Sequence, residues 1–153
     1  MMRWLIEPGA PPNLGDHVVF DRPAGSFLTG FTQARPVTTL LVNDIQIGLD
    51  GSDRAVGIDG YCPEVSWRRM NLGSRSPEIA VARVDTSLVS RGPTLRLTEP
   101  GEWPVAWDNV CRWLRLGPGT RHGSRIVAVN ANSAVEIATT SSRLVAVWIR
   151  AEF

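Results

Sequence analysis

The fold class is decided by residues 37–67, VTTLLVNDIQIGLDGSDRAVGIDGYCPEVSW. Residues 38–42 form an unbroken β-branched and apolar run, which is typical of a buried strand. Residues 45–49 then alternate apolar side chains with polar or small ones, which is the period of a second strand. The stretch predicts an antiparallel β-hairpin that leads into a compact Gly60-Tyr61-Cys62-Pro63 corner.

Two turn signals divide this stretch. Asn43-Asp44 interrupts the apolar pattern and predicts a bulge or a tight turn. In Asp50-Gly51-Ser52-Asp53, we expect Asp50 to start a turn through a local backbone hydrogen bond and Gly51 to take the positive φ. Residues 54–58 then return as a further strand.

Short strand signals recur along the rest of the chain at turn-bounded intervals. We expect irregular loops at 22–36 and 66–77, and at 109–116 we favour a strand over a helix because Gly117-Pro118-Gly119 stops the segment after eight residues. The repeated pentapeptides RIVAV and RLVAV, at 125–129 and 143–147, flank AVEIAT at 134–139 and predict a three-stranded meander. The other predicted strands are 17–21, 78–85, 88–89 and 95–98, and residues 2–7 would form an edge strand or simply dock the terminus.

This spacing predicts an all-β fold, an antiparallel sandwich or a small partly open barrel with little or no helix. No linker divides the 153 residues, so residues 1–153 are expected to form a single domain. No run approaches the 18 apolar residues of a membrane span, which predicts no membrane partner.

The charge composition excludes several function classes. All 16 basic residues are arginine, so Schiff-base, phosphate-loop and Ser-Lys chemistries that need lysine are excluded. A net charge of +1 with scattered arginines argues against a nucleic-acid or anionic-membrane surface. The sequence therefore predicts no nucleic-acid partner.

Two cysteines and two histidines are the possible metal ligands. Cys62, Cys111, His17 and His122 show none of the short paired spacings of structural zinc sites, so no metal and no cofactor is predicted. Without an apolar targeting segment, reduced cysteines and a cytoplasmic location are the expectation.

The corner after the hairpin holds the candidate catalytic residues Asp59, Tyr61 and Cys62. An acid, a phenol and a thiol fall close together there, and Asp59 follows a strand-like run rather than lying in a turn. A nucleophilic Cys62 would need a histidine or a helix N-terminus beside it, and both histidines are distant in sequence. A packed corner without chemistry is the other interpretation of the same residues.

Candidate ligand-binding residues lie further along the chain. Trp103 and Trp107 occupy a proline-bounded loop and would line an apolar pocket or a partner surface, or else pack beneath loops. His122 lies in the glycine-rich loop 117–124.

Two short motifs resemble an uncharacterised group of small all-β proteins from high-GC bacteria. They are GYCPEVSW at 60–67, after the hairpin, and the closing SRLVAVWIR at 142–150. In that group a tryptophan precedes the Gly-Tyr pair, where this chain has Asp59. The resemblance implies a bacterial all-β protein and carries no activity.

The sequence favours a non-enzymatic binding or interaction module of the bacterial cytoplasm, with a protein partner or a small apolar ligand. The alternative is a small β-barrel enzyme or carrier with an apolar cavity, whose polar group would be Asp59 or Cys62. The C-terminal strands are apolar on both faces, which predicts a homo-oligomer, in the simplest case a homodimer.

Overall fold

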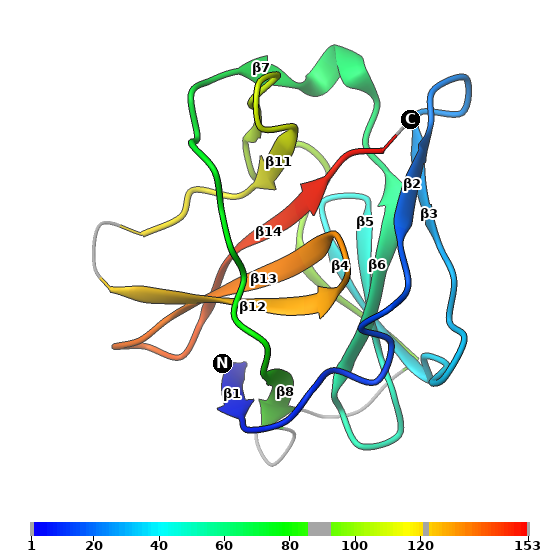
Figure 1. The fold of residues 1–153 in the computed structure, drawn as a ribbon, viewed down its shortest axis with the longest axis vertical. Helices are drawn as coiled ribbons and strands as arrows, with labels where there is room; N and C mark the ends of the chain where they lie inside the picture. The colour runs from blue at the N-terminus through cyan, green and yellow to red at the C-terminus, as the bar shows by residue number, and fades with distance from the viewer. Residues whose placement is uncertain (1, 86–92, 121–122, 153) are drawn as a thin grey trace.

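The computed structural model describes residues 2–85, 93–120 and 123–152. Fourteen β-strands and one 3₁₀ turn, η1, make up the regular structure of that part of the chain (Figure 1). No helix within it has the length and apolarity that crossing a membrane requires. The elements are β1 (Arg3–Glu7), β2 (Val18–Asp21), β3 (Ser26–Thr29), β4 (Thr38–Val42), β5 (Ile45–Leu49), β6 (Ala55–Tyr61), η1 (Glu64–Ser66), β7 (Arg68–Arg69), β8 (Val81–Asp85), β9 (Thr94–Thr98), β10 (Val105–Trp107), β11 (Trp113–Leu116), β12 (Ser124–Asn130), β13 (Ser133–Ala138) and β14 (Leu144–Arg150).

Two six-stranded sheets form a sandwich, so the predicted all-β class is confirmed. The first sheet has the order β2-β3-β6-β5-β4-β9 and the second β12-β13-β14-β11-β10-β7, while β1 and β8 form a separate pair. Neighbouring strands are antiparallel except at β4–β9 and β10–β7, which are parallel. Both sheets are open, because their edge strands do not pair with each other.

One hydrophobic cluster joins both sheets and the β1–β8 pair. It follows from strand alternation: Phe27 and Ile47 face inward from the first sheet, and Leu114, Val135 and Ile149 face them from the second. All five side chains are almost completely buried. This filled interior confines any ligand site to the ends or outer faces of the sandwich.

The predicted hairpin is confirmed as β4–β5, and β6 returns beside β5. Asn43 turns the chain between β4 and β5 with φ +53°. The Asp50 carboxylate accepts backbone N–H bonds from Ser52 and Arg54, as expected for a turn-forming aspartate. The predicted positive φ at Gly51 is wrong, since Asp53 takes it instead, at 63°.

The predicted C-terminal meander is confirmed as β12–β13–β14. Its outer face carries a second apolar cluster that includes Leu72, Ala134 and Trp148. The segment between β7 and β8 runs across this face (Figure 1) and contributes Leu72 to the cluster. The apolar outer face behind the homo-oligomer prediction is thus covered within one chain, and the oligomer stays a prediction.

Two loop assignments and one strand assignment from sequence need correction. Within 66–77, Arg68–Arg69 form β7, which pairs with β10. Residues 22–36 are not wholly irregular, because β3 lies within them and pairs with both β2 and β6. Phe27 is buried in that strand, whereas Leu28 points outward. Within 109–116 the strand is confirmed for Trp113–Leu116 only, because 109–112 form a turn held by Asp108. The predicted strand at 88–89 lies outside the described residues.

Candidate functional site

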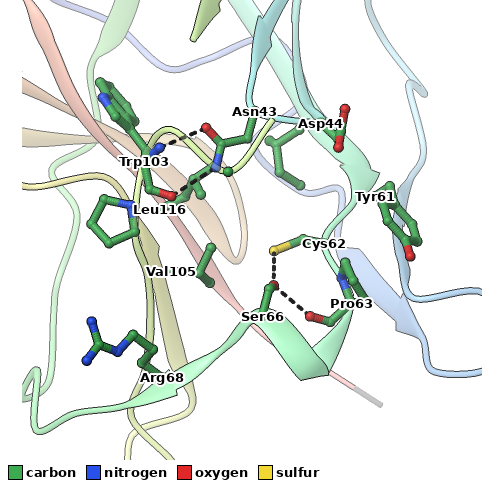
Figure 2. Close-up of a pocket in the computed structure, with 13 residues that line it drawn as sticks. Asn43, Asp44, Tyr61, Cys62, Pro63, Ser66, Arg68, Trp103, Val105 and Leu116 are labelled. Atoms are coloured by element: carbon green, nitrogen blue, oxygen red, sulfur yellow. Dashed lines mark hydrogen bonds between the residues drawn. The ribbon is translucent and has the colours of Figure 1, made fainter. Parts of the chain in front are cut away.

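A pocket of about 420 Å³ opens at one end of the sandwich, between residues of the two sheets (Figure 2). The first sheet contributes the β4–β5 turn and the corner after β6, and the second contributes the segment before β10 and the end of β11. The lining residues are Asn43, Asp44, Ile45, Tyr61, Cys62, Pro63, Ser66, Arg68, Gly101, Trp103, Pro104, Val105 and Leu116. We call this the corner pocket.

One wall is the predicted Gly-Tyr-Cys-Pro corner. Gly60 takes φ +117°, and a Cβ atom there would lie 2.5 Å from the Asp44 carbonyl oxygen, so only glycine fits. The chain then reverses through η1, where the Ser66 hydroxyl donates to the Pro63 carbonyl at 2.7 Å. The Trp67 indole N–H donates to the Cys62 carbonyl at 3.1 Å and holds the corner against the core.

The opposite wall is the segment around Trp103, and Asn43 fixes it in place. The Asn43 side-chain amide donates to the Trp103 carbonyl at 3.0 Å, and its oxygen accepts the Trp103 N–H at 3.1 Å. The Thr98 hydroxyl donates to the same oxygen at 2.8 Å. Sequence reasoning treated Asn43 only as a turn residue, and no local signal indicates a partner 60 positions away.

Cys62 lines the pocket as a buried, neutral thiol. Burial, reinforced by the charge of Asp44, raises the pKa of the Cys62 thiol above its ordinary value. Its nearest polar side-chain partner is the Ser66 hydroxyl, 3.9 Å from the sulfur. His17 pairs instead with Glu152, and His122 lies outside the described residues. The described residues therefore place no histidine beside the thiol that would make it nucleophilic.

The charged groups of the pocket lie at its rim. Asp44 lies on one side, together with the Tyr61 phenol, and the Arg68 guanidinium projects from β7 on the other (Figure 2). Among the described residues no carboxylate lies within ion-pairing distance of Arg68. Between them the walls are mostly apolar, with Ile45, Trp103, Pro104, Val105 and Leu116.

The structure separates the remaining candidates from this pocket. Asp59 pairs in register with Gln46 on the outward face of the first sheet, where partial burial raises the pKa of its carboxyl group. The Trp107 ring packs on Trp67, with ring centroids 5.0 Å apart, beside rather than in the pocket. Tyr61, Cys62 and Trp103 are the sequence candidates that the structure brings together.

No group of three or more histidine, cysteine or acidic side chains is arranged to hold a metal ion within residues 2–85, 93–120 and 123–152. Cys62 and Cys111 are both free thiols. Comparison of the chain with protein-family models, with curated protein sequences and with solved structures finds no match.

Proposed function

We propose that this chain is a non-enzymatic binding module whose corner pocket takes a small molecule with an apolar body and an anionic group at one end. The observation that carries the proposal is a pocket walled by both sheets and fixed across its width by Asn43. A volume of about 420 Å³ falls within the range of roughly 300–1,000 Å³ that small-molecule sites occupy.

The lining supports the two parts of this ligand. Val105 and Leu116 are buried apolar side chains, and Trp103 adds a large ring, so desolvation of an apolar body would drive binding. Arg68 is exposed at the rim and would bind the anionic group by donating a charge-assisted hydrogen bond to it. Asp44, at the other side of the rim, would disfavour a second negative charge there.

Binding is favoured over the alternative of a small β-barrel enzyme or carrier. An acyl- or group-transferring cysteine needs a thiolate, whereas burial keeps Cys62 protonated. Asp59, the acid considered for general acid/base work, does not line the pocket. A cytoplasmic location remains part of the proposal and is supported by the two free thiols.

The test uses two fluorescent probes that differ mainly in one charge. 8-Anilinonaphthalene-1-sulfonate carries an aromatic body and a sulfonate, and N-phenyl-1-naphthylamine has the same aromatic framework without the sulfonate. We expect saturable binding of both, and Arg68→Gln should weaken the sulfonate probe about tenfold while leaving the neutral probe within about twofold. Arg69→Gln removes the same charge from the next residue, which does not line the pocket, and should change neither affinity.

A second variant tests the aromatic part of the rim, where Tyr61 lies. Tyr61→Ala should weaken both probes, whereas Val65→Ala, an exposed apolar residue outside the pocket, should weaken neither. Backbone amide shifts in a ¹H–¹⁵N spectrum should locate the probes at the lining residues. The proposal is overturned if neither probe saturates the folded protein, or if the shifts cluster away from the corner pocket.

A further inference from the structure

A second pocket, of about 370 Å³, opens on the outer face of the second sheet. Strands β11 to β14 line it, together with residue 75 and residues 118–120. The lining residues are Arg75, Arg115, Pro118, Gly119, Thr120, Ser124, Ile126, Glu136 and Trp148. We call it the arginine pocket. Consecutive residues of β11 face opposite sides of the sheet, so Leu116 lines the corner pocket and Arg115 lines this one. The two pockets can therefore be tested separately.

The floor of the arginine pocket is a fixed polar network. Trp148 is almost wholly buried, and its indole N–H donates to Glu136 Oε1 at 2.9 Å. The Ser124 hydroxyl donates to Glu136 Oε2 at 2.7 Å. Each carboxylate oxygen of this buried glutamate thus accepts a bond from a neutral donor, which holds the floor rigid.

Two guanidinium groups stand over this floor. The Arg75 Cζ atom lies 5.2 Å from the Trp148 ring centroid, and the Arg115 Cζ atom lies 6.0 Å from it. Both arginines are within cation–π range of one indole, which places two positive charges close together. Neither forms an ion pair with any of the described residues, and the Arg115 Nε atom is buried there without a hydrogen-bond partner.

Three other surface arginines pair with carboxylates. Arg22 pairs with Glu64, Arg83 with Glu7 and Arg125 with Glu78, each through two hydrogen bonds. A buried guanidinium N–H without an acceptor costs stability, so natural proteins keep such groups rarely and at sites with a use. Among the described residues, Arg75 donates only to the Ser74 carbonyl, at 3.4 Å, and Arg115 Nε has no acceptor, so both guanidinium groups remain able to bind an anion.

We propose that the arginine pocket binds a small molecule through a singly charged, two-oxygen anion, a carboxylate or a phosphodiester, gripped between Arg75 and Arg115. Guanidinium groups match this geometry because their N–H groups form a planar fork. The buried Glu136 leaves the lining with one net positive charge, which favours a monoanion over a dianion. The Glu136–Trp148 bond keeps both the ring and the cations above it in position.

The Trp148 indole N–H signal in a ¹H–¹⁵N spectrum reports on this site, and Trp148→Phe assigns it. Benzoate and dimethyl phosphate are titrated at constant ionic strength, with sodium chloride replacing the probe in the reference titration. We expect a saturable shift with at least one probe, and the one that binds identifies the carboxylate or the phosphodiester as the anion. Inorganic phosphate, mostly dianionic at pH 8, should bind more weakly than the better probe.

Substitutions that each remove one positive charge test whether the two arginines bind the anion. Arg115→Gln and Arg75→Gln should each weaken the better probe by about tenfold or more, because each removes a charge-assisted contact. Arg35→Gln removes an equal charge from an exposed position outside the pocket and should weaken it less than twofold. Arg115→Met, which places a methyl group where the unpartnered Nε lies, should not lower the melting temperature, as expected for a binding residue rather than a structural one.

Three outcomes would overturn the proposal. They are the absence of any saturable shift, equal weakening by Arg35→Gln, or unchanged affinity in both pocket variants. If Arg115→Gln fails to fold, the exposed Arg75 still carries the test, because its loop position makes its replacement harmless to the core.

Discussion

Asn43 and Trp103 are joined by two reciprocal hydrogen bonds, of 3.0 and 3.1 Å, although 60 residues separate them. The first residue turns the central hairpin, and the second stands in the far wall of the corner pocket. Asn43, which is only 8% exposed, therefore ties the two walls of the pocket together.

Asn43→Gly is expected to lower the free energy of unfolding by about 2 kcal/mol, because it leaves the Trp103 carbonyl and N–H groups without partners. Glycine is the correct replacement since it tolerates the φ of +53°. Urea denaturation followed by tryptophan fluorescence measures the change. Asn109→Gly, at an exposed turn position, adds the same conformational entropy to the unfolded chain. It should lower the free energy of unfolding much less than Asn43→Gly. Equal losses in the two variants would remove the special role of Asn43.

Gly60→Ala is expected to destabilise the fold by about 2 kcal/mol or more, because it combines a positive φ with a clash against backbone. The added Cβ would lie 2.5 Å from the Asp44 carbonyl oxygen and 3.1 Å from the Ile45 Cα atom, and neither can move without opening the hairpin. Gly51→Ala is the matched control, since nothing lies within 4 Å of its Cβ position and its φ is not positive. Thermal denaturation of both variants compares them. A Gly60→Ala protein as stable as Gly51→Ala would contradict the described corner.

Much of the fold was open to prediction from local patterns. The β4–β5 hairpin and the C-terminal meander have short connections and clear alternation of apolar and polar residues. Residues close in sequence therefore determine which strands pair. The strand β3 was missed because Ser26–Thr29 is short and flanked by Gly25 and Gly30, and its pairing with β2 and β6 outweighs those turn signals. The parallel β4–β9 pair likewise joins distant segments.

The candidate site was only partly open to prediction. Cys62 and Tyr61 stand out by residue type within one corner, and Trp103 by its ring. Their approach to one another depends on which sheet ends meet, and that is set by the order of strands rather than by local sequence. Asn43 and Arg115 are ordinary residues in the sequence, and only their contacts distinguish them.

Asp59→Asn is expected to stabilise the protein at pH 7, by less than about 1 kcal/mol because the side chain is only partly buried. Desolvation raises the pKa of the Asp59 carboxyl group in the folded state, so the folded protein retains this proton to higher pH than the unfolded chain. Above the folded-state pKa the ionised Asp59 carboxylate destabilises the folded protein, and the neutral amide that Asp59→Asn introduces avoids this destabilisation. Below the ordinary value of 3.8 both states are protonated, and the gain should disappear. Chemical denaturation at pH 7 and pH 3 checks this, and a loss at pH 7 would reveal a stabilising partner of the carboxylate.

Asp108→Asn tests a carboxyl group whose pKa is lowered, not raised, by folding. The Asp108 carboxylate accepts backbone N–H bonds from Leu72, Gly73, Val110 and Cys111, at 2.8 to 3.3 Å, and these bonds hold its pKa far below the ordinary value. A depressed folded pKa contributes stability that is fully present above the unfolded value of 3.8 and is lost as the pH falls below it. The wild-type protein should therefore be the more stable one at pH 7. The stability difference between wild type and variant should narrow between about pH 5 and pH 2, the range over which an unfolded aspartate titrates. Urea denaturation of both proteins across this range measures the difference. A stability difference that stays constant with pH would contradict this prediction. It would mean that the charge of the Asp108 carboxylate does not contribute to stability.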